Sequence, residues 1–191
     1  MTHKKGFTLI ELLIAITIFS LIMAGIYPIF TQITAFNQEN YIRTALMDNL
    51  RAGMDRMTRE LREATSVDLE ENEESTYIFF SHPDPNNPGE TESVKYELST
   101  SSYSIGHFPN GKEIKRYKFN NETNSWEGGN PITEPTIYSL KFLRVGQNIK
   151  IEIISKVQLR QKQAPMDYIY IANVAVRNPL LSTQEQEEQE E

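Results

Sequence analysis

The stretch that decides the fold is FTLIELLIAITIFSLIMAGIYPIF, which occupies residues 7–30. Its 24 residues include a single charged side chain, that of Glu11. With a rise of about 1.5 Å per residue, a helix of this length spans roughly 36 Å, which exceeds the bilayer's hydrocarbon core of about 30 Å. The mean hydropathy of the whole chain is -0.48, so the apolar character is concentrated in one place. The stretch therefore predicts one membrane-spanning helix near the N-terminus.

The charges around this helix predict its orientation. Residues 1–6 form a short polar leader that contains Lys4 and Lys5, and the next basic residue along the chain is Arg43. Because basic residues near a membrane helix stay on the cytoplasmic side, we expect the N-terminus inside the cell and the rest of the chain exported.

Two simpler explanations of the apolar run are a secretory signal peptide and an ordinary signal anchor. A signal peptide has an apolar region of about 7–15 residues followed by a small-x-small cleavage site, and this run is too long and lacks a good site. A signal anchor fits the length. However, an acidic residue in a membrane segment is costly, and such residues are usually functional, so Glu11 argues against a plain anchor.

The residues from Lys4 to Leu13, KKGFTLIELL, resemble the class III signal of type IV pilins and type II secretion pseudopilins. The resemblance is near complete over about ten residues. It implies that a prepilin peptidase cuts between Gly6 and Phe7 and that the new Phe7 amine is then methylated. It also implies that Glu11 pairs with the N-terminal amine of a neighbouring subunit during filament assembly, and that Pro28 is the family's proline within the helix.

Physical reasons accompany each of these implied roles. Gly6 has no side chain, so the scissile backbone can enter a protease cleft closely, and Lys4 and Lys5 hold that bond on the cytoplasmic side. A charge in an apolar filament core is tolerable only when it is paired, which suits Glu11. Pro28 cannot donate a hydrogen bond to the fourth carbonyl before it, so we expect a kink or local melting near Ala24 and Gly25. The alternative is that Pro28 ends the membrane span.

The sequence predicts that the helix continues to about residue 65. Residues 7–30 would be its membrane or filament-core half and residues 31–65 an amphipathic half. Gly53 would mark the close approach of a strand, and Met47 is expected in the core together with the residues that recur on one helix face, Leu46, Leu50, Met54, Met57, Leu61 and Ala64.

A β-rich head is expected over residues 66–180, followed by a disordered acidic tail over residues 181–191. Alternating β-branched and aromatic residues predict the strands, and Asn110-Gly111 and Gly146-Gln147 predict turns. No alternation of strands with helices is present, so the sheet should be antiparallel. The fold class is α+β, a pilin-like ladle. The expected strands are Thr76–Ser81, Ser93–Leu98, Ser102–His107, Lys112–Phe119, Thr136–Arg144, Asn148–Ser155, Lys156–Arg160 and Tyr168–Arg177.

The head carries few signs of chemistry. There are no cysteines, the three histidines are scattered, and no nucleophile, P-loop or dinucleotide motif is present, so we expect no enzyme and no cofactor. The net charge of -7 disfavours nucleic acid as a partner. The weak candidates for calcium ligands are Asp84, Asn86 and Glu90, which lie in a turn that does not match an EF-hand. We therefore predict no metal site. Trp126 is expected in a loop, as a lid over the core or an exposed contact.

The resemblance implies a non-catalytic subunit of a type IV pilus or a type II secretion pseudopilus. The run from Met57 to Ala64 resembles minor pilins and minor pseudopilins of the PilW/GspJ type. The implied partners are other pilin or pseudopilin subunits, the prepilin peptidase and an inner-membrane assembly platform. The implied location is the inner membrane, then a filament at the periplasm or cell surface. The alternatives are a major pilin, or a membrane-tethered binding module or enzyme that uses the same export signal.

Overall fold

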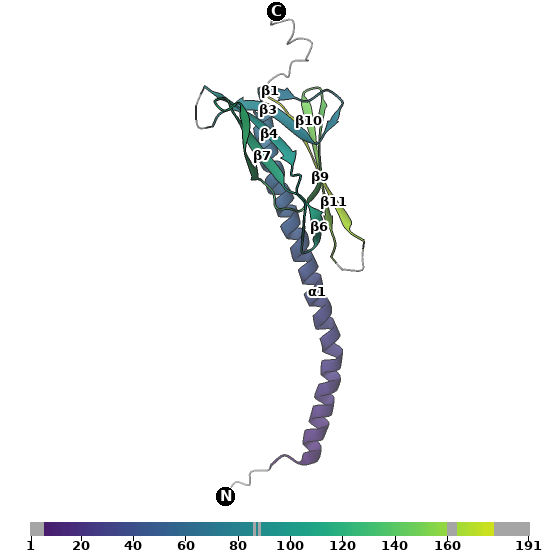
Figure 1. The fold of residues 1–191 in the computed structure, drawn as a ribbon. Helices are drawn as coiled ribbons and strands as arrows, with labels where there is room; N and C mark the ends of the chain where they lie inside the picture. The colour runs from purple at the N-terminus through teal and green to yellow at the C-terminus, as the bar shows by residue number, and fades with distance from the viewer. Residues whose placement is uncertain (1–5, 86, 88, 160–163, 178–191) are drawn as a thin grey trace, which may run out of the picture. The chain divides into compact units, whose positions relative to one another are not determined.

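The computed structural model describes residues 6–85, 87, 89–159 and 164–177. One helix, α1 (Leu9–Arg62), precedes all of the strands (Figure 1). The strands of the described part of the chain are β1 (Ser66–Asp68), β2 (Glu74–Ser75), β3 (Tyr77–Pro83), β4 (Thr91–Leu98), β5 (Tyr103–Ile105), β6 (Phe108–Gly111), β7 (Ile114–Asn120), β8 (Ser125–Pro131), β9 (Ile137–Val145), β10 (Asn148–Val157) and β11 (Met166–Ala175).

The chain divides into two compact units, residues 1–44 and residues 45–191. The described part of the first unit is the N-terminal part of α1 and the three residues before it, and residues 6–38 are all exposed. α1 is the one helix of the described chain that is long and apolar enough to cross a membrane. Its exposed apolar side chains have no partner in the isolated subunit, so they need a lipid or protein environment.

Pro28 lies inside α1, and the helix continues without interruption on both sides of it. The predicted local melting near Ala24 and Gly25 is therefore wrong. Figure 1 shows this part of the helix curving gently instead. The missing N–H of Pro28 removes one bond from a helix of 54 residues, and such a loss can bend a helix without ending it. The hydroxyl of Thr31 donates to the Pro28 carbonyl at 2.8 Å.

In the second unit, the C-terminal part of α1 presents the predicted apolar face to the sheets. Every residue of that face is at most 2% exposed, from Leu46 through Leu61 to Ala64. Met47, which was expected in the core, is 36% exposed, because it lies one position away from the buried stripe. The helix ends at Arg62, slightly before the predicted residue 65, and the Arg62 carbonyl accepts a hydrogen bond from the Arg177 N–H at 3.0 Å.

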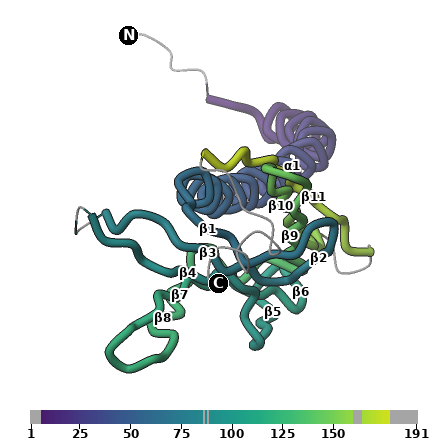
Figure 2. Tube along the Cα trace, turned by 90° about the horizontal axis from the view of Figure 1, so that it is seen from above, coloured from purple at the N-terminus to yellow at the C-terminus, as the bar shows by residue number. Residues whose placement is uncertain are grey.

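The strands form a five-stranded sheet in the order β1-β3-β4-β7-β8, a four-stranded sheet in the order β11-β10-β9-β2, and the β5-β6 hairpin. Figure 2 shows β8 at one edge of the five-stranded sheet. All pairings between these strands are antiparallel, which confirms the predicted α+β class. The predicted separate strand at 156–160 is wrong, because β10 runs on to Val157 and Gln158 and Leu159 are not in a strand.

One of the two predicted turns is wrong. The β5-β6 hairpin turns at Gly106 and His107, whereas Asn110 and Gly111 lie in β6. Gly111 is required for a different reason: a Cβ there would lie 1.9 Å from the carbonyl oxygen of Pro135, so only glycine permits this backbone approach. The turn at Gly146-Gln147 is confirmed, since it joins β9 to β10 and Gly146 has a φ of 59°.

Trp126 lies in β8, an element that the sequence did not predict. Its indole is half-buried and packs beside Phe79 and Phe119 on a sheet face, so Trp126 is in a strand instead of a loop and is not a lid over the core. The core itself is formed by the inward side chains of the sheets and α1, among them Ile78, Tyr96, Phe142 and Ile151. The predicted acidic tail, residues 181–191, lies outside the described residues.

Candidate processing and assembly site

The segment before α1 is open to solvent and is not helical. Gly6, Phe7 and Thr8 are all exposed, and the Phe7 side chain is 92% exposed. A Cβ added at Gly6 would meet nothing within 4 Å, and its backbone is not in the left-handed region. Nothing in the described fold therefore requires glycine at this position. A requirement for Gly6 would have to come from another molecule that grips the backbone here.

Thr8 starts the helix through a capping box. The Thr8 carbonyl accepts the Leu12 N–H at 3.3 Å, and the Thr8 hydroxyl accepts the Glu11 N–H at 3.3 Å. In return, the Thr8 N–H and hydroxyl both donate to Oε2 of Glu11 at 2.9 Å. This reciprocal arrangement of a threonine with a glutamate three residues later satisfies helix N–H groups that would otherwise lack partners.

Glu11 thus has a role within its own chain. A carboxylate in the first turn of a helix is also favoured by the helix dipole. Its other oxygen, Oε1, has no hydrogen-bond partner among the described residues, so the carboxylate can accept a second donor. Sequence reasoning missed Thr8, although the T-x-x-E spacing before an apolar run is the signal of a capping box.

The other predicted residues of this site are not brought to Glu11. Lys4 and Lys5 lie outside the described residues. Pro28 lies 17 positions further along a continuous helix, which corresponds to roughly 25 Å at 1.5 Å per residue. Pro28 therefore belongs to a different part of α1, and the site proper consists of Gly6, Phe7, Thr8 and Glu11.

The calcium candidates do not form an oxygen cage in the described residues. The Asp84 side chain is buried, and its carboxylate lies 3.3 Å from Nζ of Lys118 and accepts the Asn87 side-chain amide at 3.3 Å. Glu90 contacts Asp84 through its backbone carbonyl, at 2.8 Å from the Asp84 N–H. Asn86 lies outside the described residues. In the described part of the chain, no group of three His, Cys, Asp or Glu side chains could hold a metal.

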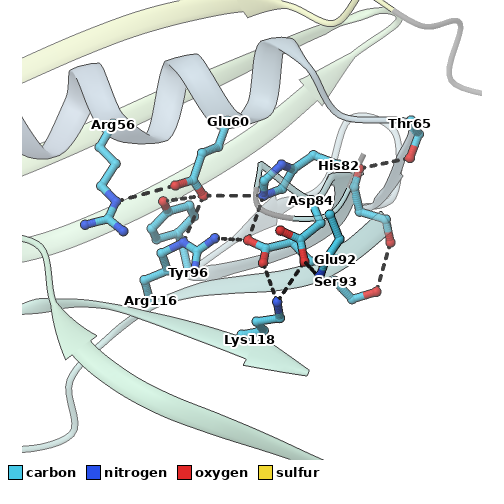
Figure 3. Close-up of polar contacts among 12 residues, drawn as sticks. Arg56, Glu60, Thr65, His82, Asp84, Glu92, Ser93, Tyr96, Arg116 and Lys118 are labelled. Atoms are coloured by element: carbon cyan, nitrogen blue, oxygen red, sulfur yellow. Dashed lines mark hydrogen bonds and ion pairs between the residues drawn. The ribbon is translucent and has the colours of Figure 1, made fainter. Parts of the chain in front are cut away.

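Sequence reasoning also missed a partly buried charged cluster between α1 and the five-stranded sheet (Figure 3). Glu60 of α1 accepts hydrogen bonds from the Tyr96 hydroxyl at 2.8 Å and from Nε of Arg116 at 3.0 Å. Arg116 also donates to Glu92, whose other oxygen lies 2.8 Å from Nζ of Lys118. Nε2 of His82 lies 3.1 Å from Glu92 but makes no hydrogen bond of good geometry.

The electrostatics of this charged cluster indicate that its ion pairs and hydrogen bonds hold α1 against the five-stranded sheet. Burial raises the pKa of the Glu92 carboxyl, but hydrogen bonds from Lys118 and Arg116 outweigh burial and hold it below its usual range. Burial, and then the charge of Glu60, raise the pKa of Tyr96 far above its usual range, so its hydroxyl stays protonated and donates. Each acid faces a base, and the cluster neutralises itself.

The comparisons with known proteins agree with the N-terminal geometry. The model of the prokaryotic N-terminal methylation motif matches residues 1–27, which include Gly6, Thr8 and Glu11. No curated protein and no solved structure matches the chain. The motif, the long helix that overlaps it and the antiparallel sheets that follow together support a type IV pilin-like protein.

Proposed function

We propose that this protein is a minor pilin or pseudopilin, a non-catalytic subunit of a type IV pilus or a type II secretion pseudopilus that acts in filament initiation or at the tip. The observation that carries the proposal is the Gly6–Phe7 bond. It lies in an exposed, non-helical segment directly before a capped helix, inside a methylation motif, and the fold itself does not need its glycine. These are the properties of a peptidase site.

Processing would divide the chain as follows. Residues 1–6 leave as the leader, with Lys4 and Lys5 keeping the bond on the cytoplasmic face, and the new Phe7 amine is methylated. Residues 7–30 anchor the subunit in the inner membrane, while residues 66–180 stay outside as the head. The uniform exposure of residues 6–38 supports this division, because so long an apolar surface needs lipid or neighbouring helices.

Assembly would move the apolar half of α1 from lipid into a filament core. There the Glu11 carboxylate pairs with the methylated amine of a neighbouring subunit, and Pro28 lets the helix adapt to its neighbours. The unpartnered Oε1 of Glu11 supports this role, because the carboxylate can take up a new donor without first losing the Thr8 bonds.

A minor role is favoured over a major one by the PilW/GspJ-type run from Met57 to Ala64 and by the lack of the C-terminal cysteine pair common in major pilins. Abundance tests this choice. We expect sheared filaments to contain only traces of this chain, and filaments built mostly of it would make it the major pilin.

The processing step is tested by replacing Gly6 with a bulky residue such as Phe. We expect Gly6→Phe to retain the leader on mass spectrometry of the membrane fraction, because the side chain blocks the approach of the backbone to the peptidase. Gly25→Ala is the matched control, since a Cβ there also meets nothing within 4 Å, and it should be cleaved normally. Normal cleavage of Gly6→Phe would refute the peptidase proposal.

A further inference from the structure

The outer face of the five-stranded sheet, opposite the face that meets α1, carries a hollow lined by aromatic rings. The alternation of the strands separates the two faces: Ile78 and Tyr96 point inward and are fully buried, whereas Phe79 and Lys95 point outward. The hollow has a volume of about 400 Å³, within the range of small-molecule sites. We call it the aromatic trough; the lining residues used below are Asp68, Phe79, Ser81, Ser93, Phe119 and Trp126.

One wall of the aromatic trough is aromatic. The rings of Phe79 and Trp126 lie 5.3 Å apart, and Phe119 meets Trp126 edge-on at 5.2 Å. Nζ of Lys95 lies 5.8 Å from the Trp126 ring and 5.9 Å from that of Phe79, and it also pairs with Glu97 at 2.9 Å. The cation thus supports the rings and is already neutralised, so the wall offers ring faces and no spare positive charge.

The floor and the opposite side of the aromatic trough are polar. Ser81 and Ser93 are cross-strand partners whose hydroxyls lie 3.0 Å apart, and these two small side chains create the hollow among the larger rings. The hydroxyl pair retains further capacity to donate and accept. The exposed Asp68 carboxylate on β1 has no hydrogen-bond or ion-pair partner within the described residues, so it is an open acceptor beside the rings.

This combination matches one ligand chemistry. A pyranose ring has an apolar face of C–H groups, which packs on an aromatic ring, and a rim of hydroxyls, which donate to carboxylates and serine hydroxyls. Because the one unpaired charge among the described residues that line the aromatic trough is negative, an anionic polymer is repelled. We propose that the aromatic trough binds the pyranose rings of a neutral polysaccharide. The proposal is independent of the role of α1 in filaments.

The chain offers a direct probe of this site, because Trp126 is its only tryptophan. We would titrate the full-length protein, in a zwitterionic detergent without a sugar headgroup, with hexamers of β-1,4-linked glucose and N-acetylglucosamine. Oligogalacturonate of the same length is the anionic comparison. The expected result is a saturable change in tryptophan emission with at least one neutral hexamer and a much weaker response to oligogalacturonate.

Two variants test whether the response comes from the proposed contacts. Asp68→Asn should weaken binding by about tenfold, because it removes a charged acceptor from an exposed position that the fold does not depend on. Phe79→Ala should weaken it similarly, and Tyr103→Ala, at an exposed aromatic residue on β5, should leave it unchanged. The proposal fails if neither neutral hexamer gives a saturable change, if oligogalacturonate binds as tightly, or if Asp68→Asn binds like the wild type.

Discussion

Glu11 has two possible roles, and a pair of substitutions separates them. In the isolated chain its Oε2 closes a capping box with Thr8, and in a filament its charge would pair with a neighbour's amine. Glu11→Gln keeps the length and the acceptor oxygen, and glutamine serves in a capping box as glutamate does, so the helix start is retained while the charge is lost. Thr8→Ala does the reverse, because it removes the hydroxyl cap and leaves the charge.

The magnitudes of the two effects differ. Thr8→Ala removes the hydroxyl bonds at 2.9 and 3.3 Å but leaves the 2.9 Å bond from the backbone N–H, and the loss of such a cap costs about 1 kcal/mol. That energy corresponds to about a fivefold increase in opening of the first turn. Filament incorporation should therefore fall by about fivefold at most. Glu11→Gln should lower it to background, because it leaves the neighbour's amine unpaired in an apolar core.

The measurement is the fraction of the chain recovered in sheared filaments, relative to the membrane fraction, by quantitative immunoblot. Mass spectrometry of the N-terminus confirms that each variant is cleaved and methylated, so that a processing defect is not mistaken for an assembly defect. Thr8→Ser, which keeps the hydroxyl, is the matched control. The charge-pairing role is wrong if Glu11→Gln enters filaments at the wild-type level, because this variant loses the charge and keeps the cap.

Two further predictions concern the second unit. The folded pKa of Glu92 is lowered, so its ion pairs stabilise the fold fully above the ordinary value of 4.5 and lose that contribution as the pH falls from there through the lowered pKa. Glu92→Gln should cost about 3 kcal/mol at neutral pH and flatten this acid dependence in urea unfolding, and an unchanged slope would contradict the assignment. A Cβ at Gly53 would lie 2.5 Å from the Thr133 methyl group, so Gly53→Ala should lower the thermal midpoint even though alanine favours the helix by about 1 kcal/mol. Gly25→Ala, in open space, should not lower it, and a raised midpoint for Gly53→Ala would show that the contact relaxes freely.

The sequence predicted the elements whose apolar residues repeat with a regular period. The buried stripe from Leu46 to Ala64 follows the helical period, and the inward residues of β10 alternate strictly, so both could be read directly. β8 could not, because it holds Gly128, Gly129 and Pro131 and has no apolar alternation. It forms because pairing with β7 compensates for weak strand propensity, and Gly129 allows close packing on the Tyr117 ring.

The charged cluster and the aromatic trough were unpredictable for a related reason. His82, Glu92 and Arg116 come from three strands, and only the register of β3, β4 and β7 brings them together. Likewise, Ser81 and Ser93 form the floor of a hollow only because larger aromatic side chains lie beside them on neighbouring strands. By contrast, the T-x-x-E spacing of Thr8 and Glu11 does predict the cap, although the same residues also resemble a signal for processing and assembly.

Under the proposed function, the capping box has a consequence for the subunit before it joins a filament. A carboxylate without a hydrogen-bond partner near the start of a lipid-facing helix is energetically costly. The helix would lower that cost by tilting, by taking up a proton or by associating with other helices at random. Thr8 donates two hydrogen bonds to one oxygen of Glu11 within the same chain, so a subunit in the membrane would carry a carboxylate that is already partly satisfied. Under the proposed function, joining a filament would bring a second donor to Oε1 while Thr8 keeps its bonds to Oε2. A subunit that returned to the bilayer would lose only that second donor, because the bonds within its own chain persist.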